Sequence, residues 1–374
     1  MTQTERAFLG IVKEGLFPIH SEEFMVNESI LDNVDWNEVY RLAGEQNVIG
    51  LVSAGLDRFR VRGSGLRVPQ AVALQFIGQT LQIEQRNKAM NGFVAELIEK
   101  LREEGVYAVL MKGQGIAQCY EKPLWRTSGD VDLLLSIENY QKAMVYLLPL
   151  SLGNKTERAY SKELGLNINQ WFVELHGTQR TGLSTRLDQG IDELQRSVFF
   201  EGKVRSETFN VNLYRTTNHS QSIQVFLPAA DEDVLFVFTH LLKHFYKEEG
   251  MSIRQICDWC RLLYRYRTEL DLRLMESRIR KMGLMTEWQA FASVAVEYLG
   301  MPSMAMPFYN DSRSCKNVAE GILRMILRSG NRGRWNAVRT AIFLFPFSTL
   351  RFLPGILFDV NWMKIRERFI KPRC

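Results

Sequence analysis

The chain has few cysteines and lacks a long apolar run. Its five cysteines are an odd number scattered along 374 residues, which fits reduced thiols better than a disulfide framework. The N-terminal stretch MTQTERAFLG lacks the basic and then apolar order of a signal peptide, and no run of about 18 uncharged apolar residues occurs. We therefore expect a cytoplasmic protein without a transmembrane segment.

Internal repeats and low-complexity tracts are also absent, and positive charge is concentrated at one end. The length and the hydrophobic content of 46% predict a folded protein of two or three domains with a sizeable core. Residues 321–374 carry eleven Lys or Arg and two acids, so the rest of the chain is slightly acidic although the net charge is +5. We therefore rank nucleic acid below a small molecule or a protein as a partner.

The C-terminal segment 337–371 alternates apolar and basic residues. It could lie on a membrane surface or on a partner, but Pro346 and Pro354 prevent one long amphipathic helix. We favour packing of this tail on a helical domain.

Hydrophobic periodicity predicts helices at both ends of the chain and strands in the middle. Apolar residues at spacings of three and four predict helices at 3–14, 36–46, 70–104, 113–120, 137–148, 188–197, 230–247, 253–266, 271–282, 286–299 and 315–329. Short β-branched and aromatic runs predict strands at 106–111, 131–135, 171–175, 207–214 and 222–227. The predicted fold class is α+β, with an N-terminal helical region (1–68), a core with a long leading helix (69–228) and a C-terminal helical domain (229–374).

Two acids stand in one of the predicted strands with a single residue between them. Residues i and i+2 of a strand point to the same side, so Asp130 and Asp132 are expected to project together and to repel unless a cation lies between them. Paired carboxylates suit Mg²⁺ or Mn²⁺, which share their coordination with substrate phosphates. Upstream, Gly113 and Gly115 open a helix after an apolar strand, a turn whose backbone N–H groups are suited to binding phosphate.

The common phosphate-binding motifs are missing. No Gly-Lys-Ser/Thr follows four residues after a first glycine, and the turn is not G-x-G-x-x-G. A lone D-x-D or G-x-G is a weak signal. The ordered combination of strand, glycine turn, helix, loop and a strand that begins with two acids favours a site that holds both phosphate and metal.

The chain resembles a family of uncharacterised bacterial nucleotidyltransferases within the polymerase-beta-like nucleotidyltransferase superfamily. The residues that carry the resemblance are Leu110-Met111-Lys112-Gly113, Tyr120, Pro123, Arg126, Asp130-Val131-Asp132-Leu133-Leu134, Glu174-Leu175-His176, His240, Lys243, His244 and Asp258. The likeness covers about residues 85–265.

The resemblance implies a mixed sheet packed by helices and a site for two metal ions. Asp130 and Asp132 would be ligands of Mg²⁺ or Mn²⁺, and Glu174 would be the third carboxylate, which either completes the metal site or takes the proton of the acceptor hydroxyl. The implied reaction is transfer of a nucleoside monophosphate from NTP to an acceptor hydroxyl with release of pyrophosphate. Neither the acceptor nor the NTP can be identified from the sequence.

The turn departs from the superfamily pattern. Gln114 follows Gly113 where Gly-Ser or Gly-Gly is common, so a serine contact to the triphosphate is missing. We expect the turn of Gly113, Gln114 and Gly115 to bind the nucleotide by its amides, with Lys112 either as a point charge near the phosphates or simply solvated. The departure also motivates an alternative, a catalytically inactive nucleotide-binding or regulatory module of the same fold.

Several charged residues around the motif have more than one interpretation. Arg126 could bind phosphate or pair with Asp130, and His176 could orient Glu174 or the acceptor, or be structural. His240, Lys243 and His244 either line the cleft opposite the sheet or form a solvated helix face.

Zinc is not expected at the histidine or cysteine pairs. His240 and His244 have a metal-ligand spacing, but the Glu of H-E-x-x-H is absent. Cys257 and Cys260 form a lone C-x-x-C without a second pair at zinc spacing, and we interpret them as packing residues.

Overall fold

The N-terminal helices form a small unit whose backbones touch. The computed structural model describes residues 1–17, 28–62, 66–153, 156–158, 162–212, 220–247, 251–328, 343–347 and 349–356. Helices α1 (Gln3–Leu16), α2 (Trp36–Glu45) and α3 (Ile49–Val61) pack together, with a 3₁₀ turn at Glu28–Leu31. A Cβ atom at Gly55 would lie 2.1 Å from the carbonyl oxygen of Ile11, so α1 and α3 meet where side chains are absent. Helix α3 was not predicted from the sequence.

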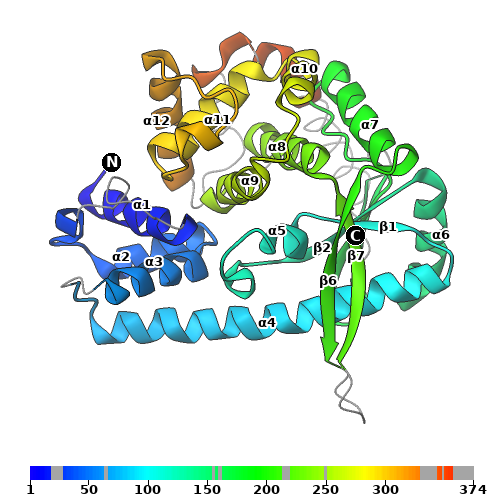
Figure 1. The fold of residues 1–374 in the computed structure, drawn as a ribbon, viewed down its shortest axis with the longest axis horizontal. Coiled ribbons are helices and arrows are strands. Elements are labelled where there is room, and N and C mark those ends of the chain that lie inside the picture. Colours follow the sequence, from blue (N-terminus) through cyan, green and yellow to red (C-terminus); the bar gives the residue numbers. More distant parts are fainter. Residues whose placement is uncertain are drawn as a thin grey trace, which may run out of the picture.

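One long helix, α4 (Gln70–Glu103), joins this unit to the rest of the chain. It begins after Pro69 and ends before Gly105, whose φ of 67° terminates it, which confirms the prediction. Its 34 residues span about 50 Å at the rise of an α-helix. Figure 1 shows α4 passing beneath the N-terminal helices and α5. It also crosses the hairpin of strands β6 (Val204–Asn212) and β7 (Ser220–Pro228).

The site-bearing sheet is mixed and has the order β1-β2-β5-β4-β3. Its strands are β1 (Ala108–Met111), β2 (Asp130–Leu135), β3 (Thr156–Arg158), β4 (Glu163–Ile168) and β5 (Trp171–His176). Only β2 and β5 are parallel; the other neighbours are antiparallel. The sheet confirms the mixed α+β organisation, and it contains two strands, β3 and β4, that were not predicted.

The last two predicted strands form a separate two-stranded sheet. β6 (Val204–Asn212) and β7 (Ser220–Pro228) pair as an antiparallel hairpin, and β7 packs beside β1. Helix α5 (Gly113–Ala117) and a 3₁₀ turn at Pro123–Trp125 connect β1 to β2, while α6 (Ile137–Leu147) and α7 (Thr185–Phe200) follow β2 and β5.

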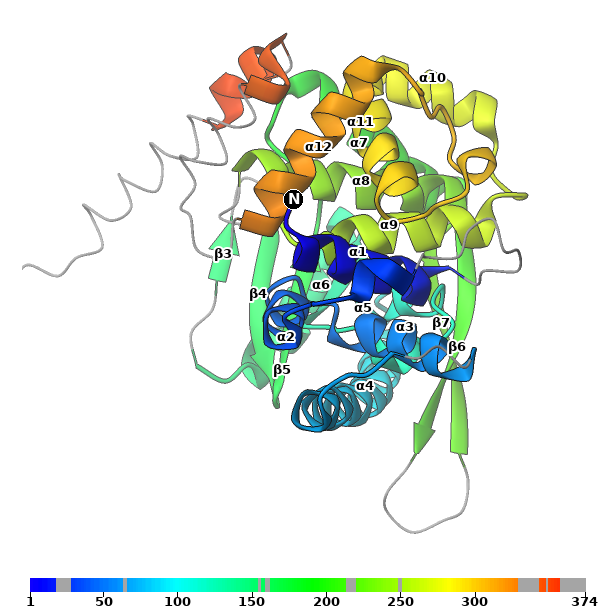
Figure 2. The ribbon, with the colours of Figure 1, turned by 90° about the vertical axis from the view of Figure 1, so that its left-hand side faces the viewer.

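Five helices gather above the sheet, as Figures 1 and 2 show. They are α8 (Ala230–Lys247), α9 (Ile253–Tyr266), α10 (Leu272–Met282), α11 (Met285–Glu297) and α12 (Arg313–Arg328), close to the predicted bounds. The ring centroid of Phe238 lies 5.0 Å from that of Trp259 and 4.8 Å from that of Trp288. Cys257 and Cys260 are fully buried in this core, which confirms that they pack, and burial raises the pKa of both thiols.

Two remaining expectations concern the membrane and the tail. No helix in the described part of the chain has the length and the apolar character needed to cross a bilayer. Most of the segment 337–371 lies outside the described residues, so packing of the tail stays a prediction.

Candidate functional site

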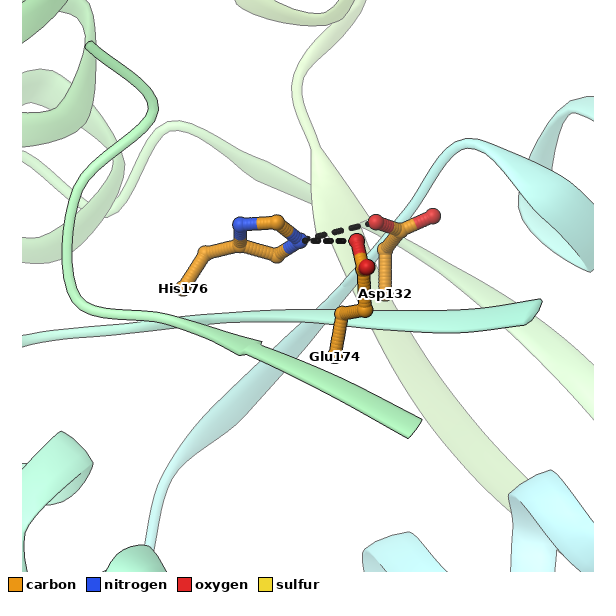
Figure 3. Close-up of side chains that lie close together, drawn as sticks. All are labelled: Asp132, Glu174 and His176. Carbon is orange, nitrogen blue, oxygen red and sulfur yellow. Dashed lines mark hydrogen bonds and ion pairs between the residues drawn. The ribbon is translucent and has the colours of Figure 1, made fainter. Parts of the chain in front are cut away.

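The parallel pairing of β2 with β5 brings the predicted acids together. In this register Asp132 lies opposite Glu174, and Leu134 lies opposite His176. Because side chains of a strand alternate, Asp130 and Asp132 share one side of β2 with Glu174 and His176 of β5. His176 Nε2 lies 2.8 Å from Asp132 Oδ1 and 3.5 Å from Glu174 Oε2, as Figure 3 shows.

Three of these side chains form a group suited to a metal ion. One ligand atom each from Asp132, Glu174 and His176 lies within 4.8 Å of the others. Carboxylate oxygens and an imidazole nitrogen match the ligands of divalent cations, so the residues present fit a metal. The group contains two of the three acids that the sequence indicated, Asp132 and Glu174, and has His176 in the place of Asp130.

The three carboxyl groups of the site have differently shifted pKa values. Burial opposes ionisation of Asp132, but Lys112 and His176 lower its pKa well below the usual range. The charge of Asp132, together with burial, raises the pKa of Asp130. Burial and then Asp132 raise the pKa of Glu174 to about 7. The repulsion predicted between the acids is therefore present: Asp132 keeps its negative charge, and Asp130 and Glu174 hold their protons more tightly than usual.

Lys112 supplies the positive charge nearest to the acids. Met111 pairs with Asp132 across β1 and β2, so the next residue turns its side chain back over the site. Lys112 Nζ lies 2.9 Å from Asp132 Oδ1, and the side chain is 11% exposed. Burial opposes its charge, but Asp132 and Asp130 raise the pKa of Lys112. The interpretation of Lys112 as a solvated strand end is therefore wrong.

The glycine turn after β1 has an unusual backbone conformation and a buried Gln114 side chain. Lys112 and Gly113 both have positive φ, 51° and 37°, which is a costly conformation for a lysine and is often found at functional turns. Gln114 is 2% exposed; its amide donates to Asn87 Oδ1 at 3.2 Å and accepts from Ser128 Oγ at 3.3 Å. A Cβ atom at Gly115 would lie 2.2 Å from Leu227 Cδ2. The Gln114 side chain therefore points into the protein and Gly115 packs closely against β7, while binding of the nucleotide by the backbone amides of Gly113, Gln114 and Gly115 stays a prediction.

Arg126 has a different partner from the one weighed in the sequence. Its Nε and Nη2 donate to the two carboxylate oxygens of Asp258 at 2.8 Å and 2.7 Å, so it does not pair with Asp130. Tyr120 Oη also donates to Asp258, at 2.8 Å. Although burial opposes its charge, Asp258 raises the pKa of Arg126 above its ordinary value.

Helix α8 covers the site from the opposite side. His240, Lys243 and His244 all line the same pocket as the acids, so the interpretation of a fully solvated helix face is wrong. His240 Nε2 lies 2.9 Å from His244 Nε2, and Lys243 Nζ lies 3.5 Å from Glu163. Burial and then the charge of Lys112 lower the pKa of His240 well below its ordinary value, so His240 is neutral at pH 7.

The pocket enclosed by these elements, the carboxylate pocket, has a volume of about 270 Å³. The residues that line it and that the sequence did not single out are Ile116, Glu163, Gln179, Val237, Leu241, Arg254 and Gln255. Glu163 was missed because β4 was not predicted. Arg254 has no sequence signal of its own, since it is one arginine among several on a helix.

Comparison with known proteins gives one match. The model of a family described as uncharacterised nucleotidyltransferase matches residues 32–300, which include the whole carboxylate pocket. Curated proteins and solved structures gave no match.

Proposed function

The chain belongs to the family of uncharacterised nucleotidyltransferases, and from this we propose that the carboxylate pocket transfers a nucleoside monophosphate from an NTP to an acceptor hydroxyl. The observation that carries the proposal is the register of β2 and β5, which sets Asp132 opposite Glu174 with Asp130 on the same side. A polymerase-beta-like arrangement of three acids on adjacent strands is part of this proposal, as is a small-molecule or protein acceptor.

The acids would hold the divalent cation that such a reaction uses. Asp130, Asp132 and Glu174, with His176 beside them, offer the donor set. Mg²⁺ or Mn²⁺ bound there would neutralise the triphosphate and make the acceptor hydroxyl more acidic. Lys112, close to Asp132, is positioned to bind a phosphate oxygen as a point charge.

Glu174 is the proposed general base. A group whose pKa lies near 7 takes up a proton readily at neutral pH and releases it again afterwards. The acceptor oxygen would form a bond to the α-phosphorus while its proton passes to Glu174. The bond from the α-phosphorus to the bridging oxygen would break, and pyrophosphate would leave with that electron pair.

The buried position of Gln114 favours a second candidate, a nucleotide-binding module without turnover. Where the superfamily has a serine hydroxyl for the triphosphate, this chain has an amide that faces Asn87 and Ser128. Such a module would bind Mg²⁺ and NTP but release no pyrophosphate.

Melting temperatures and pyrophosphate release test both candidates. We expect Mg²⁺ with one of the four NTPs to stabilise the wild type, by about 2.7 kcal/mol at 100 times the dissociation constant. Asp132→Asn should lose this stabilisation; if Glu174 serves mainly as the base, Glu174→Gln should keep it and lose pyrophosphate release by on the order of 10². The exposed acid Glu138 gives a matched control, Glu138→Gln. An equal shift in wild type and Asp132→Asn would refute the proposal, and binding without release in the wild type would favour the module.

A further inference from the structure

A second, larger pocket adjoins the carboxylate pocket. It has a volume of about 530 Å³, within the range of sites that bind small molecules. Its walls come from α3 and from the segment around the 3₁₀ turn Pro123–Trp125. Arg126 and Arg254 line both pockets, so the two spaces meet at these two residues. We call this space the basic pocket.

The charge of the basic pocket is opposite to that of its neighbour. Six of its lining residues are Arg or Lys and two are acids, whereas five acids and four Arg or Lys line the carboxylate pocket. Several of these cations are already paired, as Arg58 is with Glu121 and Lys122 with Asp57. The pocket wall nevertheless has more positive than negative groups, which favours an anionic ligand.

Arg254 is the cation with unused hydrogen-bonding capacity. Its Nη1 donates to the carbonyl of Thr127 at 2.8 Å, but its Nε is buried and has no hydrogen-bond partner in the described parts of the chain. Arg126 and Arg254 share two neighbouring acids, Asp258, whose two oxygens Arg126 already occupies, and Asp130. Burial, and then the charge of Arg126, lower the pKa of Arg254. A bound anion would pair with the Arg254 guanidinium and so stabilise its charge. It would also supply a hydrogen-bond acceptor.

The walls of the basic pocket are fixed in place. A Cβ atom at Gly50 of α3 would lie 2.0 Å from the carbonyl oxygen of Trp125, so α3 contacts the turn directly. Trp125 Nε1 donates to Glu84 at 2.9 Å, and Lys122 Nζ lies 3.6 Å from the centre of the indole ring. A rigid pocket loses little freedom on binding a ligand.

We propose that the basic pocket binds the acceptor through an anionic group, a phosphate or a carboxylate, held by Arg254 beside Arg126. The hydroxyl of the acceptor would then reach past the two guanidinium groups toward Glu174. The acceptor class is therefore an anionic small molecule that also carries a hydroxyl. Its identification as the acceptor depends on the proposed function, whereas anion binding at Arg254 does not.

Inorganic phosphate is the probe for this site, measured by calorimetry without metal. We expect wild-type protein to bind phosphate and Arg254→Gln to bind it on the order of tenfold more weakly or less. Arg254→Lys, which keeps the charge but loses the planar fork, should fall between the two. Arg265→Gln is the matched control, since Arg265 is an exposed arginine on the same helix.

A second titration distinguishes the acceptor from the nucleotide. Phosphate should bind equally well when Mg²⁺ and a non-hydrolysable NTP analogue saturate the protein. Competition between phosphate and the analogue would assign these arginines to the nucleotide and overturn the acceptor site. No phosphate binding, or equal binding by wild type and Arg254→Gln, would overturn the anion site itself. Arg254-dependent phosphate binding without any NTP binding would leave the anion site standing and refute the proposed function.

Discussion

At the scale of single residues, one carboxylate oxygen organises the candidate site. Asp132 Oδ1 is within 2.9 Å of Lys112 Nζ and 2.8 Å of His176 Nε2. These two partners keep Asp132 ionised although it is 3% exposed. The protein thus maintains a buried negative charge next to two acids whose pKa values it raises, which is the arrangement expected where a cation binds.

Replacing Lys112 should destabilise the folded protein. Lys112→Met leaves three acids near one another with less positive charge, so the free energy of unfolding should fall by about 3 kcal/mol. Denaturant unfolding measures it. Lys142→Met, which removes an exposed lysine paired with Glu138, is the control and should change stability by less than about 0.5 kcal/mol. Equal effects of the two substitutions would show that the pair with Asp132 is not stabilising.

The raised pKa of Glu174 should appear as a dependence of stability on pH. Between the ordinary value of 4.5 and about 7, the folded protein holds a proton on Glu174 that the unfolded chain has lost. The folded state binds more protons there, so the free energy of unfolding should fall as pH rises through this window, by on the order of 1–3 kcal/mol. Asp130 acts in the same direction, whereas Asp132 affects stability only at more acidic pH.

Urea unfolding at pH 5 and pH 7.5 tests this dependence. Glu174→Gln should flatten the fall, because glutamine does not titrate. Glu269→Gln, at an exposed position, should leave it unchanged. A wild-type stability that rises steadily between these pH values would contradict the raised pKa.

The sequence located the acids but not their surroundings. Strand alternation correctly predicted that Asp130 and Asp132 project to the same side, since that depends only on local geometry, whereas the position of Glu174 beside them depends on the pairing of β2 with β5. The partner of Arg126 could not be predicted, because Asp258 lies 132 residues away on another helix. The inward orientation of Gln114 likewise depends on Asn87, which a local pattern does not contain.

At the scale of elements, the close contact of α1 with α3 depends on a glycine, Gly55, which has no side chain. Gly55→Ala would place a methyl group 2.1 Å from the carbonyl oxygen of Ile11, so the helices must separate. We expect a loss of about 2–4 kcal/mol in the free energy of unfolding. Gly78→Ala, in an exposed part of α4 with no atom within 4 Å of the added carbon, should instead stabilise by about 0.5–1 kcal/mol. Similar effects of both substitutions would contradict the close packing.

Two glycines within α3 explain why this helix was not predicted from the sequence. Gly50 and Gly55 lower its helix propensity, and its N-terminal residue Val48 provides no side-chain cap. Strand β4 has Gly165 at its centre, where the ring of Phe172 occupies the space of a side chain. The amphipathic helix α12 was predicted well because its buried residues recur at helical spacing and its other face is exposed.

At the scale of the whole molecule, one face of α4 fixes the N-terminal helices relative to the site. Thr80 Oγ1 lies 2.8 Å from Ser53 Oγ of α3. Two turns further on, Asn87 Nδ2 donates to the carbonyls of Leu124 and Arg126, each at 2.7 Å. The two elements that line the basic pocket, α3 and the turn at Pro123–Trp125, are thus attached to α4 at Thr80 and at Asn87.

Changing the length of α4 between Thr80 and Asn87 should destabilise the protein more than changing an exposed side chain there. Inserting one alanine after Gln82 rotates one half of α4 by about 100° relative to the other, so the contacts of Thr80 and Asn87 cannot both form. We expect a loss of about 3 kcal/mol or more in the free energy of unfolding and the loss of phosphate binding. Gln82→Ala, which alters the same exposed surface at constant length, should retain both properties. An insertion variant as stable as Gln82→Ala would contradict the role of α4 as a spacer.

This spacing has a consequence for how the protein can evolve. Exposed positions between Thr80 and Asn87 such as Gln82 and Gln85 are free to drift, unlike Arg86, which lies over the ring of Trp171. Insertions and deletions are not tolerated there, since each would change both the rotation and the distance between two anchored ends. Descendants of this gene should therefore diverge in the letters of this stretch while inheriting its length unchanged, so that the number of residues, rather than their identity, is the trait under selection.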